Sequence, residues 1–69
     1  MKNSNLIAAR KKAEMTQKAV ATVLGIAESA YRRYELGVTI PSAVMGNKIA
    51  KALKTTSEYL WGYGTAKEL

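Results

Sequence analysis

The stretch of sequence that decides the fold covers residues 16–37 and reads TQKAVATVLGIAESAYRRYELG. Its apolar residues recur at the spacing of one face of an α-helix. Gly25 follows the last apolar residue of the first half, and glycine at this place can adopt the positive φ that ends a helix. The stretch therefore predicts two short helices, residues 17–24 and 28–35, joined by a tight turn.

The second of these helices predicts a polar face opposite its buried side. Ala30, Tyr31 and Tyr34 are expected to face the core. Four polar residues occupy positions i, i+1, i+4 and i+5, which share one face because about 3.6 residues make a helical turn. They are Glu28, Ser29, Arg32 and Arg33. This face is the first candidate binding surface.

Three further helical elements are expected, at residues 5–13, 43–53 and 57–62. In the first of them the core positions are Leu6, Ala9 and Ala13. In the second, which follows Pro41 and a capping Ser42, they are Val44, Met45, Ile49 and Leu53. The chain is thus expected to be a single all-α domain over residues 1–69, with a core at about 5–62 and a flexible tail at 63–69.

Composition limits the class of protein. A chain of 69 residues has room for one small domain, and 48% hydrophobic content without Phe implies a core of small aliphatic side chains, which suits helices. The sequence has no Cys and no His, which argues against a disulfide scaffold, a Cys/His zinc site and the usual nucleophile and base pairs. The five acidic residues suggest no paired-carboxylate site. We therefore expect neither enzyme activity nor a metal or cofactor.

The net charge of +6 favours a polyanionic partner. Lysines and arginines are spread over most of the predicted helices, so the charge alone is equally consistent with a solvated surface. No apolar run approaches about 18 residues, and the N-terminus lacks the pattern of a signal peptide. We expect a cytoplasmic protein without a membrane anchor.

Several motifs follow one another in a familiar order. T-Q-x-x-V-A-x-x-L-G-I precedes R-Y-E-x-G, and P-S and I-A-K-A-L come after it. Over residues 5–62 this pattern resembles the lambda Cro and repressor type, or XRE-like, helix-turn-helix family. The resemblance implies a compact bundle of four to five short helices whose second and third helices bind DNA. It also implies association with the nucleoid of a bacterial cell.

Arg10 lies beside the apolar stripe of the first helix and needs a partner, because an unpaired buried charge is costly. Members of the resembled family commonly pair an arginine of the first helix with the glutamate that ends the third. These positions are Arg10 and Glu35 here. We expect a structural ion pair between them, with phosphate contact as a second role for Arg10.

The resemblance implies that residues 28–35 enter the major groove, where Glu28, Ser29, Arg32 and Arg33 lie nearest the bases. Arginine can donate two hydrogen bonds to guanine. Base reading is favoured over phosphate contact for Arg33 and is evenly balanced with it for Arg32. Glu28 can accept from cytosine or can simply be an acid favoured at a helix N-terminus.

Phosphate contacts are expected where helices begin, because free amides and the helix dipole favour an anion there. Thr16 and Gln17 occupy the anchoring positions of the resembled family. The alternative is that Thr16 is simply a helix cap and Gln17 an ordinary exposed amide, neither of which contacts DNA. Weaker candidates near the following loop are Thr39, Ser42 and Ala43. The loop at 38–40 has no basic residue, so phosphate contact by the loop is less favoured; Lys11, Lys12 and Lys18 could offset this, although solvated lysines are the favoured interpretation.

Members of the resembled family usually bind near-palindromic operators as two-fold dimers. One set of candidate dimer contacts is Leu36, Val38 and Ile40. A second set is Tyr59, Trp61 and Tyr63, although Trp61 can instead close the core with Leu60.

The sequence thus predicts a phage or prophage Cro-like repressor. We expect it to occupy double-stranded DNA as a homodimer, without a membrane partner or a small-molecule ligand. The alternative is a protein-interaction module, such as an antitoxin or adaptor, on the same scaffold. Arg32 and Arg33 favour DNA, whereas the apolar loop and the aromatic residues near the C-terminus leave room for a protein partner.

Overall fold

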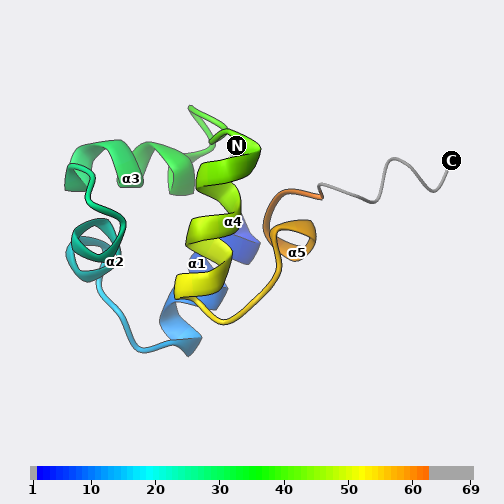
Figure 1. Ribbon diagram of the computed structural model, residues 1–69, viewed down its shortest axis with the longest axis horizontal. Coiled ribbons are helices and arrows are strands. Elements are labelled where there is room, and N and C mark those ends of the chain that lie inside the picture. Colours follow the sequence, from blue (N-terminus) through cyan, green and yellow to red (C-terminus); the bar gives the residue numbers. More distant parts are fainter. Residues whose placement is uncertain (1, 63–69) are drawn as a thin grey trace, which may run out of the picture.

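Five α-helices make up the part of the chain that this computed structural model describes, residues 2–62. They are α1 (Ser4–Lys12), α2 (Gln17–Leu24), α3 (Glu28–Leu36), α4 (Ala43–Ala52) and α5 (Ser57–Trp61), shown in Figure 1. No strand occurs within residues 2–62, so the predicted all-α class is confirmed. The tail predicted at 63–69 lies outside the described residues.

Short polar side chains cap the N-termini of four of these helices. Asn3, Thr16, Ser42 and Thr56 each accept a hydrogen bond from the backbone N–H three residues further on. Each bond satisfies a donor that the start of a helix leaves unpaired, which stabilises a helix by about 1 kcal/mol. Helix α3 lacks such a bond because Ala27 precedes it.

Glycines end α2 and α3. Gly25 has φ 73° and Gly37 has φ 76°, both in the left-handed region. A β-carbon placed on Gly25 would meet no atom within 4 Å, so its backbone conformation, and not lack of space, favours glycine there. The turn at Gly25 brings α3 directly after α2 and completes a helix-turn-helix.

The core collects small and aliphatic side chains around one tyrosine. Its nine buried apolar residues are Leu6, Ala9, Val20, Ala21, Tyr31, Ile49, Ala50, Leu53 and Leu60. All five helices contribute to this set or adjoin it, and α3 packs against α1 and α2 at the periphery of the bundle (Figure 1). Within residues 2–62, none of the helices has the length and apolar character needed to cross a bilayer.

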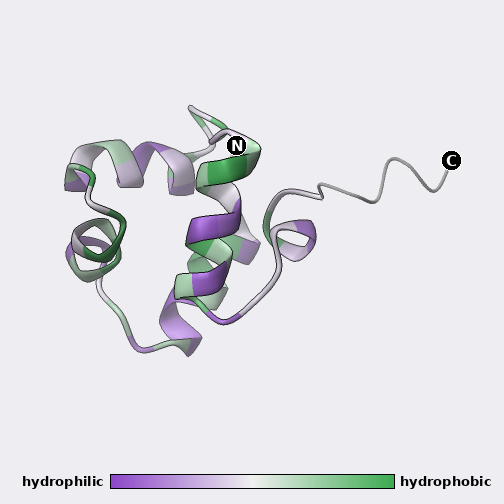
Figure 2. Ribbon diagram, in the orientation of Figure 1, coloured by the Kyte–Doolittle hydropathy of each residue, from purple (hydrophilic) through white to green (hydrophobic). Residues whose placement is uncertain are grey.

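The prediction that Val44 faces the core is wrong, because this side chain is 68% exposed. The buried side of α4 is set by Gly46, Ile49 and Ala50. Val44 precedes Gly46 by two residues, which is about 200° around a helix and therefore on the opposite side. Figure 2 shows hydrophobic residues in the N-terminal turn of α4. The structure thus places an additional apolar side chain next to the α3–α4 loop.

Candidate nucleic-acid interface

Helix α3 turns one polar face away from the bundle, here called the α3 face. Ser29, Arg32 and Arg33 are exposed on it, and Glu28 is partly exposed. Tyr31 and Glu35 are the buried residues of the same helix. The helical period therefore separates the residues that anchor α3 from those that can meet a ligand.

Arg32 is held loosely on the α3 face. Its Nη2 lies 3.2 Å from Oε2 of Glu28, one turn earlier, and both side chains are at least 40% exposed. Its Nε donates to Oε1 of Gln17 at 3.4 Å. An exposed pair of this kind contributes only a few tenths of a kcal/mol, so a ligand can replace it.

Arg33 differs from Arg32 in having no side-chain hydrogen bond or ion pair to any residue in the range 2–62. Its side chain is exposed near the C-terminal end of α3. All five N–H donors of its guanidinium are therefore open to a ligand from solvent.

A network of hydrogen bonds around Glu35 holds α3 from its buried side. Glu35 is 3% exposed. Arg10 forms the expected ion pair, with its Nε 2.5 Å from Oε2 of Glu35. The Tyr31 hydroxyl donates to the same oxygen at 2.7 Å, and Nε2 of Gln17 donates to Oε1 at 2.9 Å. No buried side-chain nitrogen or oxygen within residues 2–62 lacks a partner.

These contacts set the ionisation of the groups in the network. Burial by itself would raise the pKa of Glu35, but hydrogen bonds from Arg10, Tyr31 and Gln17 outweigh it and leave that pKa below the ordinary value. Burial, followed by the hydrogen bond to Glu35, raises the pKa of Tyr31. The hydrogen bond to Glu35 raises the pKa of Arg10. The carboxylate is therefore charged and the phenol neutral near neutral pH.

Arg10 has little capacity left for a ligand. Its Nη1 donates to the carbonyl oxygen of Met15 at 3.0 Å, and its side chain is only 14% exposed. The geometry assigns Arg10 to the scaffold, where it fixes the turn after α1 as well as α3.

Gln17 uses both ends of its amide, so its interpretation as an ordinary exposed amide is wrong. The nitrogen donates to Glu35 and the oxygen accepts from Arg32. Gln17 thereby joins the buried network to the α3 face. One of its two N–H donors is not used in these bonds. The T-Q motif places this residue at the start of α2, but nothing in the sequence shows which way its amide turns.

The other predicted phosphate contacts lie at helix starts. The Thr16 Oγ1 accepts from the amide of Ala19 at 3.0 Å, and the Ser42 Oγ accepts from Met45 at 3.2 Å. Both hydroxyls keep their proton for donation to a ligand. Thr39 and Ala43, which stand close to Ser42 in the chain, are exposed.

A family comparison identifies this arrangement. The sequence profile of a helix-turn-helix family matches residues 6–60, which is most of the chain. The chain belongs to the XRE-type helix-turn-helix family. This is a family of DNA-binding regulators and not of enzymes, so double-stranded DNA is the partner of the helix-turn-helix. A search of curated proteins and of solved structures gave no match.

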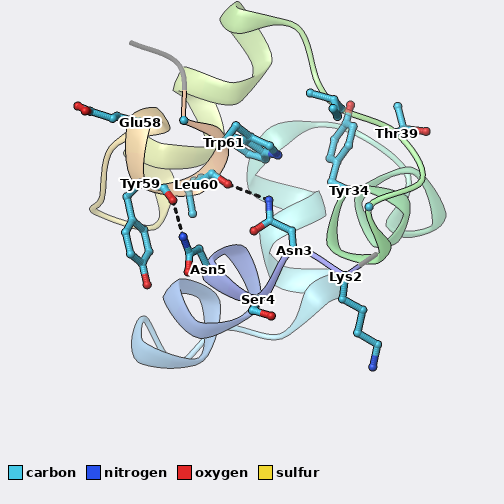
Figure 3. Close-up of a pocket in the computed structure, with 13 residues that line it drawn as sticks. Lys2, Asn3, Ser4, Asn5, Tyr34, Thr39, Glu58, Tyr59, Leu60 and Trp61 are labelled. Carbon is cyan, nitrogen blue, oxygen red and sulfur yellow. Dashed lines mark hydrogen bonds between the residues drawn. The ribbon is translucent and has the colours of Figure 1, made fainter. Parts of the chain in front are cut away.

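The helix-turn-helix domain brings one residue of the first set of candidate dimer contacts, Ile40, to the second set. Ile40 of the first set and Tyr59 and Trp61 of the second line one hollow of about 540 Å³, between the start of α1, the α3–α4 loop and α5 (Figure 3). Val38 is 69% and Leu36 43% exposed nearby in the chain. Tyr63 lies outside the described residues.

Two asparagines that the sequence analysis missed build one wall of this hollow in the helix-turn-helix domain. Asn3 donates from Nδ2 to the carbonyl oxygen of Leu60 at 2.9 Å, and Asn5 donates to that of Tyr59 at 2.8 Å (Figure 3). The backbone N–H of Asn3 also donates to the backbone carbonyl oxygen of Glu35, at 2.9 Å. The N-cap role of Asn3 could have been predicted from the sequence, because Asn3 directly precedes the apolar stripe of α1.

Proposed function

We propose that this helix-turn-helix protein is a sequence-specific transcriptional repressor of the Cro type, which acts by occupying an operator. The observation that carries the proposal is the contrast between the two sides of α3. One side is tied to the scaffold through Glu35, and the other presents Arg33 without a protein partner. A recognition element needs this combination of rigid support and free donors.

In the proposed complex, α3 lies in the major groove. The guanidinium group of Arg33 donates two hydrogen bonds, to the O6 and N7 atoms of guanine. Arg32 leaves Glu28 to contact a base or phosphate, and Glu28 then accepts from cytosine. Ser29 contributes a hydroxyl that can donate or accept and adds little discrimination between bases.

Phosphates are contacted at the starts of α2 and α4. Thr16 and Gln17 donate at the first of these sites, and Ser42, Thr39 and the amide of Ala43 donate at the second. The dipoles of α2 and α4 favour an anion at these ends. Such contacts set the register of α3 on the duplex but are blind to its sequence.

Two copies of the protein bind one near-palindromic operator in this proposal. The exposed apolar residues of the α3–α4 loop lie directly after α3, so a contact between them would set the distance between two recognition helices. Consecutive major grooves on one side of the duplex lie about 34–36 Å apart. The motif order of the Cro and repressor type supports a phage or prophage origin and a place of action on the bacterial nucleoid.

Selection of bound duplexes from a random-sequence pool tests the proposal. We expect enrichment of a near-palindromic motif, with affinity that falls by orders of magnitude between about 50 and 200 mM salt. The Arg33→Ala variant is the matched control and should lose the preference at one position of each half-site. If no motif is enriched and salt has little effect, the chain is a protein-interaction module on the same scaffold.

A further inference from the structure

A groove at the C-terminal ends of α1 and α4 lies apart from the DNA-binding elements. It has a volume of about 490 Å³, and its lining comes from α1, α5 and the residues at and after the end of α4. No lining residue belongs to α2 or α3. Figure 1 shows the C-terminal ends of α1 and α4 toward the bottom of the view and α3 at the top. A ligand in this groove would leave the α3 face uncovered.

The floor of the groove is apolar and concave. Ala8, Ala13 and Leu53 line it together with Tyr59, whose side chain is 46% exposed. Alanine side chains are too short to fill the space between two helices, so the hollow remains open. Its volume falls within the range of about 300–1,000 Å³ that is typical of ligand pockets in proteins.

Two lysines stand at the rim of the groove. Lys12 from the end of α1 and Lys54 from the residues after α4 are exposed, and neither forms a hydrogen bond or ion pair through its ammonium group to any residue described. The nearest acids in the chain, Glu14 and Glu58, are not paired with them. An apolar floor is thus flanked by two lysines that have no ion-pair partner among the described residues.

One of the residues that line the groove, Lys54, also has an unusual backbone conformation. Glu14 and Lys54 have φ 59° and 58°, and they are the only non-glycine residues with positive φ within residues 2–62. The other left-handed positions there are Gly25, Gly37 and Gly62. Glycine would adopt this conformation without strain. Of the two residues only Lys54 lines the groove, so a lysine stands there at a conformational cost that glycine would not have.

We propose that this groove docks an acidic amphipathic segment of a partner protein. Apolar side chains of the segment occupy the space between Ala8, Ala13 and Tyr59, and its carboxylates pair with Lys12 and Lys54. This interaction is separate from DNA binding and does not rest on the proposed repressor function. It adds a protein partner on the side of the molecule away from α3.

Other occupants fit the groove less well. A second copy of the chain carries a net charge of +6, and two of its five acids are already engaged, Glu35 in the buried network and Glu28 with Arg32. Like charges across such a contact would oppose association. Duplex DNA would satisfy the lysines, but its phosphates would leave the apolar floor unfilled. Only an acidic and amphipathic partner matches both features.

A titration of the ¹⁵N-labelled full chain with a synthetic peptide tests the proposal. The peptide is a two-heptad helix with leucine at i, i+3, i+4 and i+7 and glutamate elsewhere, and its control has glutamine at every glutamate. We expect chemical-shift changes at the amides of Ala8, Ala13 and Thr55, with those of Ser29 and Arg33 unchanged. The glutamine peptide should bind at least fivefold more weakly.

Charge reversal at neighbouring lysines provides the matched variants. Lys11 and Lys12 are both exposed in the last turn of α1, but only Lys12 lines the groove. Lys12→Glu should weaken peptide binding at least fivefold, and Lys11→Glu less than twofold. Equal effects of the two variants, or shifts centred on α3, would overturn the proposal. Groove shifts that depend on protein concentration without peptide would assign the groove to a second copy. The same shifts on addition of duplex DNA would assign it to phosphate.

Discussion

Nε2 of Gln17 donates to Oε1 of Glu35 at 2.9 Å, which joins the first residue of α2 to the last turn of α3. The same carboxylate accepts from Arg10 of α1, so three helices meet at one buried charge. The other end of the Gln17 amide accepts from Arg32 on the α3 face. The angle between the two helices of the helix-turn-helix and the position of one candidate base-reading residue thus depend on the same network.

Removal of the carboxylate should destabilise the fold strongly. Glu35→Ala leaves Arg10 largely buried without its partner, and loss of one member of a buried pair costs about 3–5 kcal/mol. The urea midpoint, followed by circular dichroism at 222 nm, measures the change. Glu58→Ala removes an exposed carboxylate as the control and should shift stability by less than about 0.5 kcal/mol. An unchanged midpoint for Glu35→Ala would show that the pair adds nothing to stability.

Stability should fall in acid because of the same residue. The pKa of Glu35 is lower in the folded protein than its ordinary value of 4.5. Its contribution is complete above pH 4.5 and is lost as the pH falls from there through the lowered pKa, because the unfolded chain takes up the proton first. Urea unfolding at pH 6 and pH 3 should show a smaller loss for Glu35→Gln, which cannot titrate, than for the native protein. Equal losses would contradict this assignment.

Gln17→Ala should have separate effects on the stability of the fold and on base preference in DNA binding. The variant loses one hydrogen bond to a charged group that retains two other donors, so we expect a cost of about 1–2 kcal/mol in stability. When the side-chain oxygen of Gln17 is absent, Arg32 is less constrained. Base preference should then relax at the position that Arg32 reads, while the preference at the position of Arg33 is kept. Selection of bound duplexes with each variant measures this. A loss of affinity that is uniform over all sequences would make Gln17 a phosphate anchor only.

Arg33→Ala should weaken binding to the selected operator by about 1–3 kcal/mol and relax preference at one base pair of each half-site. Its urea midpoint should stay unchanged, since the side chain has no partner within residues 2–62. Lys18→Ala is the comparison, because Lys18 is exposed in the first turn of α2, where we propose phosphate contacts. That variant should weaken all sequences alike and reduce the slope of affinity against salt. The same behaviour from Arg33→Ala would remove it from the base-reading set.

Two exposed valines offer a matched test of the dimer surface. Val38 in the α3–α4 loop is 69% exposed, and Val23 on α2 is 63% exposed. Val38→Glu should prevent two copies from binding one operator cooperatively, because two carboxylates would face each other across the two-fold axis. Val23→Glu should leave the complex unchanged. Sedimentation of the protein with operator DNA measures the number of copies bound, and equal results for both variants would place the contact elsewhere.

Much of the fold could be predicted from local signals. The capping roles of Thr16 and Ser42 and the left-handed turn at Gly25 each depend on a few neighbouring residues, and the structure contains all three. The inward side of α4 could not be fully read in this way. Its first turn carries Val44 as well as Met45, and the burial of Gly46 and Ile49 against neighbouring helices decided which side faces the core.

In the candidate site, too, some features follow from local spacing and others from tertiary contacts. The spacing of Arg32 and Arg33 was enough to place both on an outer helical face, since one helical period governs them. Resemblance to the family implied the pairing of Arg10 with Glu35, but it did not reveal Gln17 as the link between Glu35 and Arg32. That link joins residues 15 and 18 positions apart in the chain.

The sequence by itself determined the helices, their ends and the polar face of α3, because caps, glycines and apolar spacing act within one or two turns. Only the tertiary structure decided which way Gln17 turns, that Val44 is exposed, that Ile40 lines the same hollow as Trp61, and that the ends of α1 and α4 enclose a groove. These features arise where segments distant in the chain are packed together, and burial there selects partners that no local pattern contains.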